Sequence, residues 1–99
     1  MVIEWDEEKN KINLQKHGIS FEEVKEAFND PFLIELYDKE HSTLKEDRYI
    51  CLGSIGNFVI VYVVFTDRKG KIRIISARKA EPLEEKAYYE NVKRTLGRN

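Results

Sequence analysis

The sequence has one cysteine, two prolines and no long apolar run, and these scarcities exclude several classes of protein. Cys51 has no second thiol for an intramolecular disulfide, and its place in the apolar run 49–52 indicates a buried, unreactive side chain. No apolar segment approaches the roughly 18 residues that span a bilayer, and the N-terminus lacks the basic and apolar regions of a signal peptide. The sequence therefore predicts a cytoplasmic protein without membrane contact.

Common catalytic and cofactor-binding signatures are also missing. The sequence contains no P-loop, no dinucleotide-binding glycine motif, no nucleophile elbow, no paired cysteines and no His-Glu zinc motif. His17, His41 and Cys51 are the only soft metal ligands, and their spacing does not match a zinc site. We therefore expect no cofactor and favour a mechanism without a metal.

The composition that remains is that of one folded domain covering residues 1–99. A chain of this length cannot support two separate cores. Its hydrophobic residues make up 41% and its aromatic residues 11% of the chain, which is enough for one core and unlike a disordered sequence.

The net charge of −1 hides an uneven distribution along the chain. Residues 1–67 contain 7 Lys and Arg against 14 Asp and Glu, whereas residues 68–99 contain 10 against 4. The first segment is therefore at −7 and the second at +6. A basic C-terminal third favours contact with phosphates, although a solvated helix and an ordinary basic turn would give the same count.

Local patterns predict an α+β fold in the order β-α-α-β-β-β-β-α. Asp6 is a typical N-cap and Gly18 a typical helix end, while Ser20 and Glu23 form a capping box. The almost wholly apolar run 58–66 predicts the central strand of an antiparallel sheet, covered on both faces. The expected elements are a strand or arm at 1–5, helices at 6–17 and 20–29, strands at 32–37, 48–55, 58–66 and 72–77, and a last helix at 82–96. Polar residues 38–47 are expected to form a loop.

Two groups of residues could carry chemistry. Lys9, Asn13, Lys16 and His17 share one face of the first helix, which is either a solvated face or a phosphate-facing row that ends in an imidazole. Arg48 and Arg78 stand at strand ends, where a rigid guanidinium can fork onto a phosphate. A surface ion pair, with Glu46 or Asp47 beside Arg48, is the alternative.

Taken together, these residues resemble the BrnT family of toxins. The resemblance runs from residue 3 to about residue 90. It rests on Trp5-Asp6, Lys9, Asn13, Lys16-His17-Gly18, Ser20-Phe21-Glu22-Glu23, Glu46-x-Arg48-Tyr49, Gly53, Arg73-x-Ile75-Ser76-Ala77-Arg78-Lys79-Ala80, Glu84 and Tyr88.

The resemblance implies a RelE-like fold, with helices packed on an antiparallel sheet, and a ribonuclease toxin of a type II toxin-antitoxin system. It also implies a BrnA-like antitoxin as partner, with RNA as substrate and with operator DNA reached only through the antitoxin. Nothing in the composition indicates that partner.

The mechanism that we expect is metal-independent attack of the RNA 2′-hydroxyl on the adjacent phosphate. Arg48 and Arg78 would stabilise the charged transition state, and His17 or Glu46 would act as the base. Lys16 or Tyr88 would assist the leaving oxygen. RNA-binding roles are expected for Lys9, Lys16, Arg73 and Lys79. Two rival hypotheses are a non-catalytic module that acts with an antitoxin as co-repressor, and an RNA-binding domain that does not cleave.

Overall fold

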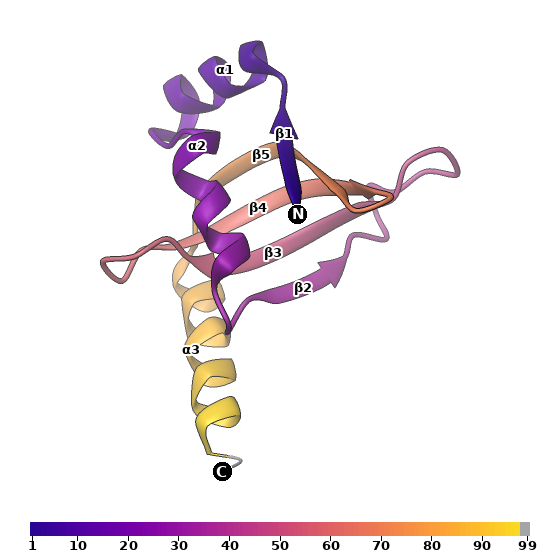
Figure 1. The fold of residues 1–99 in the computed structure, drawn as a ribbon. Helices are drawn as coiled ribbons and strands as arrows, with labels where there is room; N and C mark the ends of the chain where they lie inside the picture. The colour runs from indigo at the N-terminus through magenta and orange to yellow at the C-terminus, as the bar shows by residue number, and fades with distance from the viewer. Residues whose placement is uncertain (98–99) are drawn as a thin grey trace.

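Five strands form one sheet with β4 at its centre, in the order β1-β5-β4-β3-β2 (Figure 1). The computed structural model describes residues 1–97. Its elements are β1 (Val2–Trp5), α1 (Glu7–His17), α2 (Phe21–Val24), the 3₁₀ helix η1 (Lys25–Asn29), β2 (Ile34–Tyr37), β3 (Arg48–Ser54), β4 (Ile60–Arg68), β5 (Lys71–Lys79) and α3 (Pro82–Leu96). This order confirms the predicted α+β fold and the central position of the apolar run.

The helix ends follow the capping signals in the sequence. The Asp6 carboxylate accepts a hydrogen bond from the backbone N–H of Glu8 at 2.8 Å, and Gly18 ends α1 in the left-handed conformation with φ of 70°. Ser20 and Glu23 form the expected capping box. The starts of both helices were therefore predicted correctly from the sequence.

The second predicted helix, 20–29, is wound in two ways. It is α-helical only as far as Val24 and continues as the 3₁₀ helix η1. The buried residues Phe21, Val24 and Ala27 recur every three positions. A 3₁₀ helix has three residues per turn, so side chains with this spacing lie along one side of it. The tighter winding thus keeps this line of side chains against the sheet.

The sheet is mixed, which corrects the expectation of a purely antiparallel one. Strands β2 to β5 form an antiparallel meander, but β1 runs parallel to β5, with Val2 opposite Lys71 and Trp5 opposite Ile74. This pairing joins segments about 70 positions apart in the chain. Local sequence pattern carries no information about such a pairing.

Helix α1 lies at the edge of β5, beyond the stretch that pairs with β1. The Asn13 side-chain amide donates to the carbonyl of Ala77 at 2.8 Å and accepts from its N–H at 3.1 Å, as a neighbouring strand would. It also donates to the carbonyl of Ile19 at 3.0 Å. Asn13 is buried, so its expected place in a phosphate-facing row is wrong.

In the described part of the chain, no helix has the length and apolar character needed to cross a membrane.

The main core lies on one face of the sheet, beneath α2 and η1. Its buried side chains come from both layers, among them Phe21 and Val24 from α2 and Val61, Val63 and Phe65 from β4. A Cβ added to Gly53 would lie 2.9 Å from the Cβ of Ala27, so glycine on β3 permits the close approach of η1. Cys51 is buried in this core as predicted, and burial raises the pKa of its thiol to about 12.

The other face of the sheet is covered at one end only, by α3. Leu52, Ile60 and Tyr88 form a small second cluster there, whereas Tyr62 and Val64 of the same β4 strand are half-buried. The expectation that β4 is covered on both faces is therefore right for one end only.

The beginning of the apolar run was wrongly assigned to the central strand. Phe58 is 88% exposed, and β4 begins at Ile60. The backbone φ angles of Asn57 and Phe58 are 52° and 62°, in the left-handed region. These residues therefore belong to the tight turn that reverses the chain between β3 and β4, which moves Phe58 out of the sheet.

Candidate functional site

Four of the arginines lie on the sheet face opposite α2 and η1: Arg48, Arg73 and Arg78, and Arg68 beside the β4–β5 turn. We call the part of this face that α3 leaves uncovered the open face; it carries Arg48, Ile50, Tyr62, Val64, Thr66, Arg73, Ile75, Ser76 and Arg78. Side chains alternate along a strand, and the register assigns these residues to one side. On β5 the alternation is interrupted by a bulge opposite Val64 and Phe65, where the consecutive residues Ile75 and Ser76 both face this side.

A polar row crosses the open face at one end. Arg48 on β3 lies opposite Thr66 on β4, Thr66 lies opposite Arg73 on β5, and Arg73 lies opposite Glu4 on β1. The guanidinium of Arg73 is 4.0 Å from the Glu4 carboxylate. Positive charge is therefore concentrated on the middle strands, with an acid at the edge.

Arg78 lies at the opposite end of the open face, paired with Tyr62 on β4. Thr66 and Tyr62 are four residues apart, which corresponds to about 13 Å along a strand. Arg48 and Arg78 are thus separated both along β4 and across it. Between them lie the smaller or apolar side chains of Val64 and Ser76.

A hollow of about 180 Å³ opens between these two ends. Its lining combines groups of different chemistry, namely a carboxylate, an imidazole, a guanidinium, a phenol and a hydroxyl. The lining residues are Asp38, His41, Arg48, Tyr62, Val64, Ile75 and Ser76. Sequence reasoning missed Asp38 and His41 as site residues, because residues 38–47 carry no signal beyond polarity. It missed Tyr62 and Ser76 because the register of β4 and β5 decides which of their side chains face the hollow.

Arg48 is held at the rim of the hollow by Glu46. Its Nε donates to Glu46 Oε1 at 3.1 Å, and Arg68 donates to the other carboxylate oxygen at 3.3 Å. The ion pair between Arg48 and Glu46 that the sequence offered as an alternative is therefore present. Glu46 accepts from two guanidinium groups, which fixes the orientation of Arg48.

Arg78 is held more tightly, by Glu84 of α3 and by the ring of Tyr62. Its two terminal nitrogens donate to the two oxygens of Glu84 at 2.8 and 2.9 Å, and its guanidinium carbon lies 4.0 Å from the centre of the Tyr62 ring. This hydrogen bonding raises the pKa of Arg78 and lowers the pKa of Glu84. The pair is therefore charged on both sides at neutral pH.

The hydrogen-bond pattern of Arg78 leaves one edge of the guanidinium available. Of its five N–H donors, Nη1 uses two, on Glu84 and on the carbonyl of Lys79, and Nη2 uses one. Within residues 1–97 the Nε–H has no acceptor. Nε–H and the second Nη2–H can form a fork of the kind that binds two phosphate oxygens.

Tyr88 does not line the hollow. It is 3% exposed, and its hydroxyl donates to Asp30, whose carboxylate also accepts from the backbone N–H of Ser54 at 2.8 Å. Burial and the neighbouring Asp30 raise the pKa of Tyr88. In this position Tyr88 ties α3 to the end of η1 and to β3.

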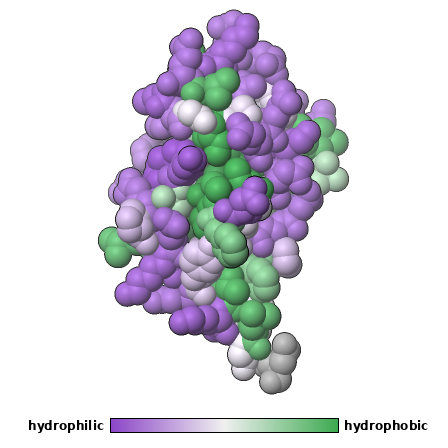
Figure 2. Space-filling view, turned by 90° about the vertical axis from the view of Figure 1, so that its left-hand side faces the viewer, coloured by the Kyte–Doolittle hydropathy of each residue, from purple (hydrophilic) through white to green (hydrophobic). Residues whose placement is uncertain are grey.

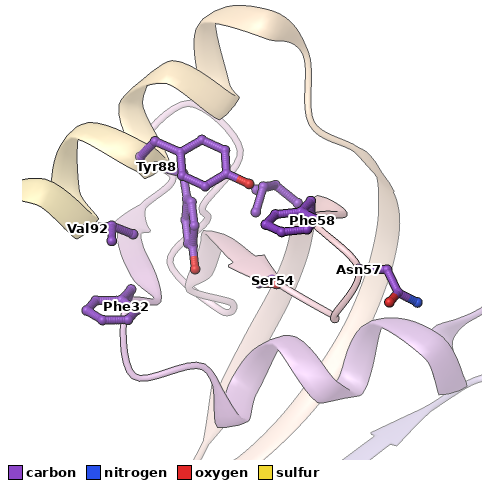
Figure 3. Close-up of a pocket in the computed structure, with 8 residues that line it drawn as sticks. Phe32, Ser54, Asn57, Phe58, Tyr88 and Val92 are labelled. Carbon is purple, nitrogen blue, oxygen red and sulfur yellow. The ribbon is translucent and has the colours of Figure 1, made fainter.

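A larger hollow of about 430 Å³ lies beside α3 (Figure 3). Aromatic and aliphatic side chains dominate its lining, which consists of Phe32, Ser54, Asn57, Phe58, Ile60, Tyr88, Tyr89 and Val92. Figure 2 shows apolar atoms in a band that continues down this side onto α3. The lining contains no basic residue, so this hollow does not suit a phosphate.

The remaining residues proposed from the sequence lie at other places. Lys9, Lys16 and His17 are on α1 at the β5 edge, with both lysines exposed. Lys79 lies opposite Val61 and so projects from the face opposite to Arg78. Among residues 1–97, no three His, Cys, Asp or Glu side chains gather closely enough to hold a metal ion.

Comparisons with known proteins agree with this architecture. A family model described as the ribonuclease toxin BrnT of type II toxin-antitoxin systems matches residues 5–84. The 1.1 Å crystal structure of the Brucella abortus ribonuclease toxin BrnT is similar, with a TM-score of 0.65 and 26% sequence identity. That match covers 82% of this chain and 97% of the Brucella chain. No curated protein matches the sequence.

Proposed function

This chain belongs to the family of BrnT ribonuclease toxins of type II toxin-antitoxin systems, and from that premise we propose that it cleaves RNA without a metal on the open face of its sheet. The observation that carries the proposal is the position of Arg48, Arg73 and Arg78 on one face of the sheet, together with a hollow on that face that Arg48 lines with hydroxyl and imidazole groups. RNA cleavage by its own 2′-hydroxyl requires positive groups that hold the phosphate and groups that move protons.

In the proposed reaction the 2′-oxygen forms a bond to the adjacent phosphorus while the bond from phosphorus to the 5′-oxygen breaks. A base removes the proton of the 2′-hydroxyl, and the leaving 5′-oxygen acquires a proton. The products are a 2′,3′-cyclic phosphate and a free 5′-hydroxyl. Arg78 would place its open fork on the non-bridging oxygens, a contribution of about 3 kcal/mol to the barrier for a well-placed donor.

Arg48 would act at a second point on the RNA. Its separation from Arg78 on the open face favours contact with a neighbouring phosphate of the same strand. Arg73, in the polar row, would add positive charge beside it. Lys9 and Lys16 would supply peripheral contacts that depend on salt, whereas the position of Lys79 on the opposite face argues against the RNA contact expected for it.

The acid and base roles proposed from the sequence differ in their structural support. Glu46 already accepts hydrogen bonds from Arg48 and Arg68, which favours a positioning role over a base. Tyr88 is buried against Asp30, which argues against a role at the leaving oxygen. His17 and Lys16 stay open as candidates at the end of α1.

A toxin of a type II system has an antitoxin partner, and we propose a BrnA-like protein in the cytoplasm, which would link the toxin to operator DNA. The larger hollow beside α3 supports a protein partner, because its lining is mainly apolar and its residue Phe58 is 88% exposed. Co-expression with the neighbouring reading frame should yield a complex with a higher melting temperature than the free chain. A failure of every neighbouring gene product to bind or to protect cells would contradict this partner.

The decisive experiment compares RNA cleavage by the wild type, Arg78→Ala and Arg78→Lys in the presence of a chelator. We expect a new cyclic phosphate end, and we expect Arg78→Ala to lower the rate about 100-fold or more. Lysine should not restore it, because an ammonium supplies charge without the planar fork. Arg94→Ala, on the exposed last turn of α3, is the matched control.

Two outcomes would overturn the proposal. Undiminished cleavage by Arg78→Ala would remove this arginine from the mechanism. A wild type that binds an antitoxin but releases no cyclic phosphate from any RNA would favour the non-catalytic co-repressor.

A further inference from the structure

The loop after β2 carries a His-Asp pair at the rim of the hollow. His41 Nδ1 lies 2.9 Å from Asp38 Oδ2 and 3.1 Å from Oδ1. The Asp38 side chain is only 10% exposed, whereas that of His41 is 64% exposed. A buried carboxylate thus holds an imidazole that is open to the solvent and to any ligand on the open face.

The direction of this contact determines which ring nitrogen is available. A carboxylate accepts hydrogen bonds and cannot donate them, so the proton of the contact is on His41 Nδ1. In the neutral ring Nε2 then carries the lone pair. A carboxylate, an imidazole held through one nitrogen and a free second nitrogen is the arrangement that activates hydroxyl groups in many enzymes.

Backbone hydrogen bonds fix the pair relative to Arg48. The N–H of Asp38 donates to the carbonyl of Arg48 at 2.8 Å. The Ser42 hydroxyl donates to the carbonyl of Asp38 at 2.7 Å and accepts from the N–H of Arg48 at 2.9 Å. The imidazole and the backbone of Arg48 are therefore held in one hydrogen-bonded frame across the ends of β2 and β3. The hollow that His41 lines reaches Tyr62, and the guanidinium of Arg78 lies over the ring of Tyr62, so His41 faces the phosphate that Arg78 would hold.

We infer that His41, positioned by Asp38, is the general base of the proposed RNA cleavage. Nε2 of His41 takes the proton of the 2′-hydroxyl as the 2′-oxygen bonds to phosphorus, and the bond to the 5′-oxygen breaks. Water protonates the leaving 5′-oxygen, and His41 then returns its proton to the solvent. This inference rests on the proposed ribonuclease function and assigns the proton transfer within it.

Few other groups near His41 could contribute to the pH dependence of the cleavage rate around neutrality. The titratable and charged groups that face it are Asp38 from its own loop, Arg48 from β3 and Tyr62 from β4, while β5 contributes only Ile75 and Ser76. Burial raises the pKa of Tyr62, so this phenol does not titrate near neutrality. Imidazole is the side chain in this set that ordinarily changes charge there.

The test measures single-turnover cleavage and its pH dependence for the wild type, His41→Ala, His41→Gln, Asp38→Asn and His17→Ala. We expect both His41 variants to lose about 100-fold in rate together with the acid limb of the profile. Asp38→Asn should lower the rate at least about 10-fold, because an amide no longer enforces the tautomer. Glu40→Gln, an exposed neighbour in the same loop, is the matched control.

Measurements of RNA affinity and melting temperature distinguish a catalytic role of His41 from a structural one. His41→Ala should bind an RNA with a 2′-O-methyl group at the cleavage site as tightly as the wild type does, with an unchanged melting temperature. If Asp38→Asn does not fold, the two His41 variants still decide the question.

Each overturning result has its own signature. If the wild type cleaves and Arg78→Ala is impaired but His41→Ala is fully active, the inference is wrong while the ribonuclease function stands. Loss of the acid limb in His17→Ala alone would assign the base to α1. If the wild type releases no cyclic phosphate, the proposed function itself fails.

Discussion

Replacement of Glu84 by glutamine tests whether α3 prepares Arg78 for the phosphate. The Glu84 carboxylate accepts from Nη1 and Nη2 of Arg78, at 2.8 and 2.9 Å, and from the backbone N–H of Glu81 at 2.8 Å. Glutamine retains one acceptor oxygen but turns an NH₂ group toward a guanidinium that can only donate. Glu84→Gln therefore breaks the two-point contact without removing the bulk of the side chain.

The structure sets the size of the expected stability loss. The Arg78 and Glu84 side chains are 29% and 24% exposed, between a surface pair and a buried one. A hydrogen bond to a charged group contributes about 1.5 to 3 kcal/mol, and exposure reduces this, so we expect a net loss of about 1 to 2 kcal/mol. For a domain of this size the melting temperature should fall by about 5 to 15 °C.

The pH dependence follows from the direction of the Glu84 shift. Its folded-state pKa is lowered below the ordinary value of 4.5, so the pair stabilises the fold above that pH and loses this contribution as the pH falls through the folded-state pKa. The difference in stability between the wild type and Glu84→Gln should therefore be constant at neutral pH. It should shrink as the pH falls from about 4.5, where Glu84 takes up a proton in the unfolded chain, to the lower pKa of the folded state.

The assay combines thermal unfolding with cleavage at 25 °C, with Glu90→Gln on the exposed side of α3 as control. Because Arg78 loses its fixed position, we expect Glu84→Gln to cleave about 10-fold more slowly than the wild type, a smaller loss than in Arg78→Ala. Wild-type cleavage and an unchanged melting temperature in Glu84→Gln would refute the idea that this pair holds Arg78 for its task.

Two further predictions concern side chains whose roles are structural. Asn13→Ala should destabilise the fold by about 3 kcal/mol, since it strands the N–H and carbonyl of Ala77 and the carbonyl of Ile19; a shift of the urea midpoint close to zero would contradict this role. Tyr88→Phe should lower stability by about 1 to 2 kcal/mol, because Asp30 loses a donor, while cleavage below the melting temperature stays unchanged. Slower cleavage at full stability would instead return Tyr88 to the chemistry.

The helices and the central strand could be predicted because their signals are local. Asp6, Gly18 and the Ser20–Glu23 box mark helix ends through contacts within a few residues, and these contacts are present. The pairing of β1 with β5 and the exposure of Phe58 were not predictable in this way. The first depends on distant segments, and the second on the left-handed turn at Asn57 and Phe58.

The candidate site could be predicted only in part. Arginines at strand ends were identifiable, but the register that brings Arg48, Arg73 and Arg78 to one face is a property of the assembled sheet. Asp38 and His41 were missed because three-residue spacing in a polar loop is common. The burial that distinguishes Asp38 arises from the pairing of its backbone with Arg48.

Because the core lies on one side of the sheet, mutations that inactivate this protein need not unfold it. Since α2 and η1 hold the main core against the face opposite to the arginines, a single substitution on the open face can abolish activity while most of the folding energy is retained. Such an inactive copy would escape the proteases that remove unfolded chains. It would still bind any partner that contacts another part of its surface. An inactive copy would therefore lower the amount of free partner that is left to neutralise its active relatives.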